Sequence, residues 1–197
     1  VLYTGRDTDK GEDGSFIWLP IDAKFPGDSY AALRDAYDSG DQAAIQAAVR
    51  QLLSDAKDAL LELAEAMKLI HAHAAEWGVK EDQIYVEGCS AGGHLAASLG
   101  VFWHESWLSE RAGVANEILR PAGLILCYPV ITSGEYAHRG SFEALLKGQK
   151  TEEMLEKVSL EKQVTEHMPP VFLWHTFTDD CVPVENSLLL IAAMRKV

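Results

Sequence analysis

Cysteine is scarce in this chain, and its few cysteines are far apart. Only three of the 197 residues are cysteine, at Cys89, Cys127 and Cys181. An odd, widely spaced set is not a disulfide framework, so a reducing, cytoplasmic location is expected. No cysteine or histidine pair has the spacing of a metal-binding motif, and we expect neither a metal nor another cofactor.

Basic charge and long apolar runs are also lacking. The chain has 17 Lys and Arg against 30 Asp and Glu, a formal net charge of −13. Such a chain repels phosphate backbones and anionic lipid surfaces, so we expect no nucleic-acid or membrane partner. No apolar run is long enough to span a bilayer, and the first residues do not read as a signal peptide. An uncharged small-molecule partner is compatible with these totals.

The order of the apolar segments predicts an α/β protein. Hydrophobic content of 48% is ordinary for a globular protein, and the length suits one domain over residues 1–197. Short β-prone runs at residues 84–86, 123–128 and 171–175 alternate with helical patterns, and the last two runs are apolar enough to be buried strands. We therefore expect a doubly wound, mostly parallel sheet.

The first third of the chain predicts a loop and then helices. We expect a loop over residues 4–28, interrupted by the aromatic cluster 16–19, which is either a small buried anchor or a pocket wall. Ala-rich residues 29–58 predict an added helical insertion or cap. Apolar residues then recur at helical spacing: Leu60, Leu63, Ala64, Met67, Ile70 and Ala74. His71 and His73 do not share a helix face, so no metal site is expected there.

The most informative stretch is Gly88-Cys89-Ser90-Ala91-Gly92, a G-x-S-x-G element between a strand pattern and a helix pattern. Turning a strand into a helix at one residue strains the serine and requires small neighbours, which glycine supplies. The turn would expose the Ser90 hydroxyl as a nucleophile and aim the Ala91 N–H at a developing oxyanion. The alternative is that small residues merely let a helix pack closely on a strand.

A serine nucleophile needs a histidine base and a carboxylate behind that base. With this motif the carboxylate comes second in the chain, on the loop after a later strand. Asp179 and Asp180 lie on the loop that follows residues 171–175. Adjacent carboxylates also form turns, but the strand context favours a catalytic carboxylate.

Three segments together resemble the α/β-hydrolase family, in particular acetyl-esterase and acetylxylan-esterase-like (BD-FAE-like) enzymes. They are residues 85–99 with G-x-S-A-G-G-H-L-A, residues 128–134 with Y-P-V-I, and residues 159–189 with W-H-T and D-x-x-V-P-V-E-N-S. As a set these motifs are specific, and they cover the chain from about residue 60 onward.

This resemblance implies a role for each matching residue. Ser90 is then the nucleophile, the Ala91 N–H is one oxyanion donor, and Asp179 rather than Asp180 is the triad acid. His94 matches a structural histidine behind the elbow. His175 matches a strand-end histidine of the family motif and not the catalytic base.

The resemblance also implies parts that these 197 residues do not contain. The family's catalytic histidine follows a further strand, yet none of the seven histidines follows Asp179, and His138 is a weak substitute. The family's N-terminal strands and H-G-G-G-type loop should precede Val1. We therefore expect the histidine to come from outside this chain, and the chain alone to be nearly inactive.

Two classes of function remain open at this point. The first is a serine carboxylester hydrolase, without cofactor, acting on small acyl esters such as acetylated sugars. The second is a non-catalytic, truncated or engineered scaffold of the same fold, associating as a homo-oligomer or with a complementing chain through helices or open sheet edges. A serine peptidase of the same fold is a weaker third possibility.

Overall fold

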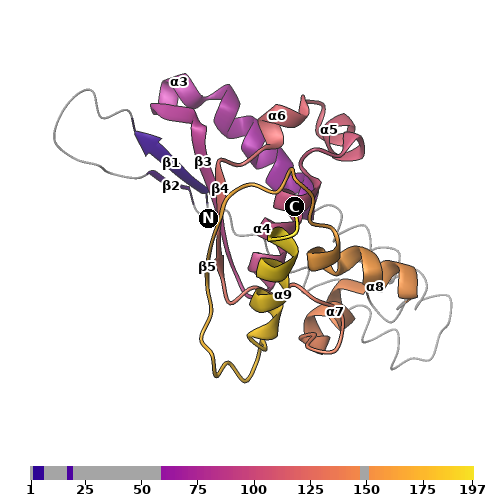
Figure 1. The fold of residues 1–197 in the computed structure, drawn as a ribbon. Helices are drawn as coiled ribbons and strands as arrows, with labels where there is room; N and C mark the ends of the chain where they lie inside the picture. Colours follow the sequence, from indigo (N-terminus) through magenta and orange to yellow (C-terminus); the bar gives the residue numbers. More distant parts are fainter. Residues whose placement is uncertain (1, 7–16, 20–58, 147–150) are drawn as a thin grey trace, which may run out of the picture.

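The computed structural model of the chain describes residues 2–6, 17–19, 59–146 and 151–197 (Figure 1). The helical insertion predicted over residues 29–58 lies outside the described residues. So do Phe16 of the aromatic cluster and most of the predicted loop.

The described strands form one five-stranded sheet in the order β2-β1-β3-β4-β5. Their bounds are β1 Leu2–Arg6, β2 Ile17–Leu19, β3 Val79–Cys89, β4 Gly123–Cys127 and β5 Val171–Trp174. Strands β3, β4 and β5 are parallel, whereas β1 pairs antiparallel with both β2 and β3. The loop expected over residues 4–28 is wrong at its start, because Thr4 continues β1 and pairs with Ile84 of β3.

Helices connect the parallel strands, as parallel pairing requires. Residues 59–72 form a helix ahead of β3. The others are α3 Ala74–Trp77, α4 Ala91–Phe102, α5 Ser106–Ala112, α6 Asn116–Leu119, α7 Arg139–Leu146, α8 Glu152–Val158, the 3₁₀ turn η2 Leu160–Lys162, and α9 Glu185–Met194. Helix α8 is capped by Thr151, whose side chain accepts a hydrogen bond from the Met154 N–H.

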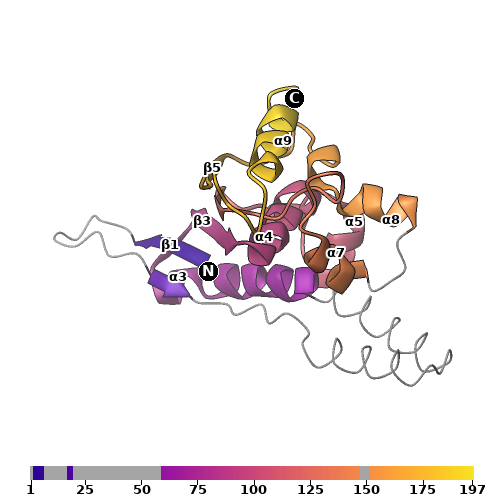
Figure 2. The same cartoon turned by 90° about the horizontal axis from the view of Figure 1, so that it is seen from below.

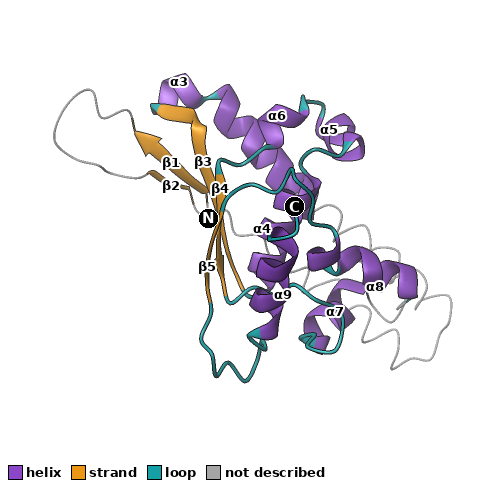
Figure 3. Cartoon of the chain, viewed as in Figure 1, coloured by secondary structure: helices purple, strands orange, loops and turns teal. Residues whose placement is uncertain are grey.

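The described helices gather on one side of the sheet (Figure 3). Helix α4 lies between α9 and the helix of residues 59–72 (Figure 2). The expectation that β5 is a buried strand is wrong, because its side chains alternate in exposure and Phe172 is 64% exposed. Within the described residues only one face of β5 is covered by helices, so every second side chain faces away from the core.

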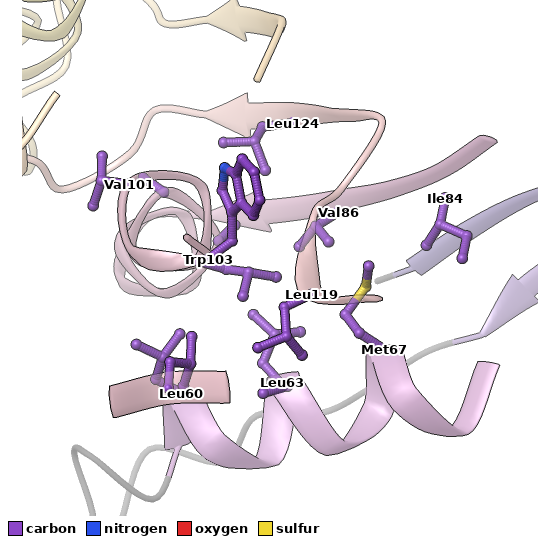
Figure 4. Packing of buried hydrophobic residues seen from close by; sticks show 14 of the residues in the cluster. Leu60, Leu63, Met67, Ile84, Val86, Val101, Trp103, Leu119 and Leu124 are labelled. Carbon is purple, nitrogen blue, oxygen red and sulfur yellow. The ribbon is translucent and has the colours of Figure 1, made fainter. Parts of the chain in front are cut away.

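The core lies between the sheet and these helices. The six apolar residues predicted to share one face of the helix over residues 59–72 and α3 are all buried, so this prediction is confirmed. Leu60, Leu63 and Met67 project from that helix toward Leu119 and the strand residue Val86 (Figure 4). Burial of such side chains contributes roughly 1.5–3 kcal/mol each, and it holds this helix against β3.

Candidate active site

The predicted turn between β3 and α4 is present, and its geometry is strained at Ser90. Ser90 has φ 54° and ψ −120°, a positive-φ backbone conformation outside the αL region that costs a non-glycine residue about 1–3 kcal/mol. Two hydrogen bonds tie this backbone to the β4 segment: the Ser90 N–H donates to the Cys127 carbonyl (3.0 Å) and the Ser90 carbonyl accepts from the Val130 N–H (3.0 Å). The pairing of β3 with the β4 segment therefore fixes the serine in a conformation that it would not adopt alone.

The glycines of the motif have unequal roles. A Cβ atom on Gly88 would lie 2.5 Å from the carbonyl carbon of Gly92, which no side chain tolerates. A Cβ atom on Gly92 would meet no other atom within 4 Å, so the expectation that both flanking glycines relieve crowding is wrong for Gly92. The second crowded position is Gly93, whose Cβ would lie 2.7 Å from the Cβ of Pro129.

The hydroxyl of Ser90 and the N–H of Ala91 lie together at the start of α4. Ser90 occupies the N-cap position, but its side chain makes no capping hydrogen bond. The hydroxyl is thus not used to stabilise the helix. The helix N-terminus carries partial positive charge and favours an anion beside it. Ala91 is the first residue of α4, so its N–H is one of the backbone donors at this helix N-terminus.

Asp179 is held firmly on the loop between β5 and α9. Its Oδ1 accepts hydrogen bonds from the N–H groups of Cys181 and Val182, both at 2.9 Å. Both hydrogen bonds lower the pKa of Asp179, and the bond from Val182 has the larger effect. The nearby His175 and His138 lower this pKa further. The neighbouring Asp180 is exposed. Asp179 is therefore the carboxylate of the pair that its own loop holds in position.

Neither histidine near Asp179 is placed as a free base. His175 donates from Nε2 to the Val182 carbonyl (2.8 Å) and accepts at Nδ1 from the Ser187 hydroxyl (2.7 Å), with only 2% of its side chain exposed. His138 lies on the loop before α7, where Nδ1 contacts the Ser141 hydroxyl (2.8 Å) and Nε2 lies 3.6 Å from the Cys181 Sγ.

His94, in the first turn of α4, is a partly buried structural group. Its Nε2 donates to the Val158 carbonyl at 3.0 Å, and its ring contacts the edge of Phe142. Burial lowers its pKa, so the neutral ring is favoured. His94 thereby links α4 to the end of α8.

The elbow, Tyr128 and the acid loop all follow the ends of parallel strands at one edge of the sheet. Parallel strands β3 and β5 both flank β4, so Ser90 and Asp179 follow strand ends at the same edge of the sheet. The pKa of Tyr128 is raised, chiefly by Cys89, and the charge of Asp179 is one of the smaller causes. Its ring packs against Trp174 with centroids 5.3 Å apart. Tyr128 thus lies near enough to both Cys89 and Asp179 for their charges to act on its hydroxyl.

Asn186 is a positioning residue that the sequence analysis did not identify. It is fully buried, and its Oδ1 accepts from the N–H groups of Ile131 (2.8 Å) and Thr132 (3.0 Å). Its Nδ2 donates to the carbonyls of Tyr136 (2.9 Å) and Pro183 (3.0 Å). One amide therefore ties the loop after β4 to the start of α9. The sequence feature that could have identified Asn186 is its position in the V-P-V-E-N-S motif.

Among the described residues, no helix is long and apolar enough to cross a membrane.

The chain is similar to proteins that act on xylan and acetyl esters. It is 39% identical over 140 residues to endo-1,4-beta-xylanase B of Butyrivibrio fibrisolvens, covering 71% of this chain and 22% of the xylanase. It is 26% identical over 139 residues to the acetylxylan esterase of Xylanibacter ruminicola, covering 68% of this chain and 26% of that esterase. The chain thus spans about a quarter of the length of these curated relatives.

Its fold is similar to that of a solved hydrolase. The acetyl ester-xyloside bifunctional hydrolase of Caldicellulosiruptor lactoaceticus superposes with a TM-score of 0.60 at 38% identity, over 70% of this chain and 50% of that structure. The BD-FAE family model matches residues 42–194, which include the elbow, the loop after β4 and the acid loop. This chain belongs to the BD-FAE family and has the α/β-hydrolase fold of its esterases.

Proposed function

We propose that the full-length protein containing this chain is a serine carboxylester hydrolase for small acyl esters, acetyl esters above all. The observation that carries the proposal is the strained backbone of Ser90 at the N-terminus of α4. Strain of this kind persists only where the surrounding structure enforces it, and it is typical of catalytic residues. The positioned carboxylate of Asp179, on the loop expected for a triad acid, supports the same conclusion.

The proposed mechanism gives each group one task. The Ser90 hydroxyl attacks the ester carbonyl, a histidine outside this chain takes its proton, and the alcohol leaves with that proton to form an acyl-enzyme. The Ala91 N–H donates to the oxyanion of each tetrahedral intermediate. Asp179 uses Oδ1 to bind its own loop, and its Oδ2 then orients the histidine. Water releases the acid in the second half of the reaction.

The proposed substrate is an acetylated sugar. One relative is an acetylxylan esterase and one similar structure is an acetyl ester-xyloside bifunctional hydrolase. A net charge of −13 disfavours anionic substrates and is compatible with a neutral sugar ester. The three cysteines are all free thiols, which supports a reducing, cytoplasmic location.

The experiment is hydrolysis of p-nitrophenyl acetate and of acetylated xylo-oligosaccharides by the full-length protein. Ser90→Ala should remove nearly all activity on both while the circular dichroism spectrum stays unchanged. Asp180→Asn, at the exposed neighbour of the acid, is the matched control and should retain activity. Full activity in Ser90→Ala would refute the proposal. An inactive wild-type protein that is folded would favour the non-catalytic scaffold instead.

A further inference from the structure

Two thiols and a carboxylate meet on the face of the sheet that points away from α4. Core residues Ile84 and Val86 of β3 pack on the helix side, so the alternating Glu87 and Cys89 project to the other face. In β4, Leu126 belongs to the same core, which places Cys127 on the face of Glu87 and Cys89. None of these three side chains has a role in the proposed hydrolysis.

The β3–β4 register brings the three groups together. Cys89 is the direct partner of Cys127 in the parallel ladder, and Glu87 precedes Cys89 by two residues. One ligand atom from each residue lies within 4.8 Å of the other two, and the Cys127 Sγ is 3.9 Å from the Glu87 Oε1. A tetrahedral metal ion that binds sulfur at about 2.3 Å and carboxylate oxygen at about 2.1 Å holds these two atoms about 3.6 Å apart. The existing separation of sulfur and oxygen is therefore close to the one a bound cation needs.

We propose that Glu87, Cys89 and Cys127 bind one thiophilic divalent cation of the Zn²⁺ class. Two thiolates select such a cation over Mg²⁺ or Ca²⁺, which prefer oxygen ligands. Two sulfurs and one carboxylate oxygen leave a fourth position of a tetrahedron for water or an external ligand. Cys89 is exposed and Cys127 is buried, so the cation has a path from solvent to the inner ligand.

The position of this site connects it to the elbow. Cys89 directly precedes Ser90, and the carbonyl of Cys127 accepts the Ser90 N–H at 3.0 Å. A cation shared by the two cysteines would cross-link β3 and β4 at the strand ends that hold Ser90. Because the cation binds the folded register and not an extended chain, it should stabilise the native state.

The test is titration of the reduced full-length protein with Co²⁺, whose thiolate complexes absorb strongly through ligand-to-metal charge transfer. The wild type should show this band, saturate at one equivalent, and lose it on addition of Zn²⁺. Cys89→Ser and Cys127→Ser should each abolish the band, and Glu87→Gln should weaken Co²⁺ binding by on the order of tenfold or more. Cys181→Ser is the matched control, because this thiol lies at the acid loop, and it should behave as wild type.

A second readout is the melting temperature with and without Zn²⁺. Zn²⁺ should raise it in the wild type and in Cys181→Ser but not in Cys89→Ser, whose fold is checked by circular dichroism. The proposal is overturned if the wild type gives no one-to-one band, if the band survives in Cys89→Ser, or if it disappears in Cys181→Ser. Neither readout depends on esterase activity, so failure here leaves the proposed hydrolysis standing.

Discussion

The Nε2 atom of His175 lies 3.6 Å from the Oδ2 atom of Asp179, but it donates its proton to the carbonyl of Val182 at 2.8 Å. Its other nitrogen is engaged by Ser187. His175 therefore fastens the acid loop to β5 and α9, and it leaves the Oδ2 of Asp179 for a partner that approaches from outside the loop.

Substitution of His175 should lower the free energy of unfolding, because this side chain holds the acid loop in place and is not the catalytic base. His175→Ala leaves the Val182 carbonyl and the Ser187 hydroxyl buried without partners, at roughly 1–3 kcal/mol each. Urea unfolding should show a loss of at least about 2 kcal/mol. Ser187→Ala removes only one of the two bonds and should cost about 0.5–1.5 kcal/mol. If His175→Ala kept wild-type stability and lost only kcat, His175 would be a catalytic base after all.

The buried amide of Asn186 should be among the most sensitive positions outside the catalytic groups. Asn186→Ala leaves the N–H groups of Ile131 and Thr132 and the carbonyl of Tyr136 without this partner, so a loss of about 3 kcal/mol or more is expected. The Pro183 carbonyl keeps its bond from the backbone N–H of residue 186. Asn116→Ala, which removes a single bond from a part-buried side chain to the Trp103 carbonyl, is the comparison and should cost about 1 kcal/mol. Equal losses in the two variants would contradict the anchoring role.

Substitution by alanine should have opposite effects on stability at Gly88 and Gly92, the two glycines of the G-x-S-x-G motif. Gly88→Ala drives a Cβ into the backbone of Gly92 and should destabilise the protein by roughly 3 kcal/mol or prevent folding. Gly92→Ala meets open space in the first turn of α4 and should be neutral or stabilising by up to about 1 kcal/mol. The measurement is thermal unfolding, in which the melting temperature of each variant is compared with that of the wild type. A strongly destabilised Gly92→Ala would show that the crowding at the elbow is not as described.

Much of this arrangement could be predicted from the sequence because it is local. The buried face from Leu60 to Ala74 follows from helical periodicity, and the turn at Ser90 follows from a strand, two glycines and a helix in succession. The contacts of Asn186 could not be predicted, since they depend on how α9 docks against a loop fifty residues earlier. The meeting of Cys89 with Cys127 depends in the same way on the β3–β4 register. The crowding at Gly93 rather than Gly92 arises from Pro129, across that same strand pair.

The carboxylate of Asp179 predicts a pH dependence with a definite sign. Its pKa is lowered in the folded state by the N–H groups of Val182 and Cys181. Its stabilising contribution is therefore complete above the unfolded-state pKa of about 4 and is lost as pH falls through the lower folded-state value. The free energy of unfolding of the wild type should exceed that of Asp179→Asn at pH 7, and the difference should shrink toward pH 2.

The role of Asp179 can also be tested through kcat, independently of its effect on stability. Asp179→Asn keeps an oxygen for the two N–H groups but removes the charge that orients the histidine, so kcat should fall by about 10⁴-fold. Asp180→Asn, at the exposed neighbour, should leave kcat unchanged. A pH-independent difference, or a large effect at Asp180, would mean that the acid has been assigned to the wrong residue.

The central claim is that Ser90 is the nucleophile, and covalent labelling tests it most directly. The full-length protein is incubated with a fluorophosphonate, digested, and analysed by peptide mass spectrometry. We expect one phosphonyl group, located on Ser90, with labelling lost in Ser90→Ala and strongly slowed in Asp179→Asn. Absence of label from Ser90 in a folded protein that hydrolyses p-nitrophenyl acetate would contradict the account.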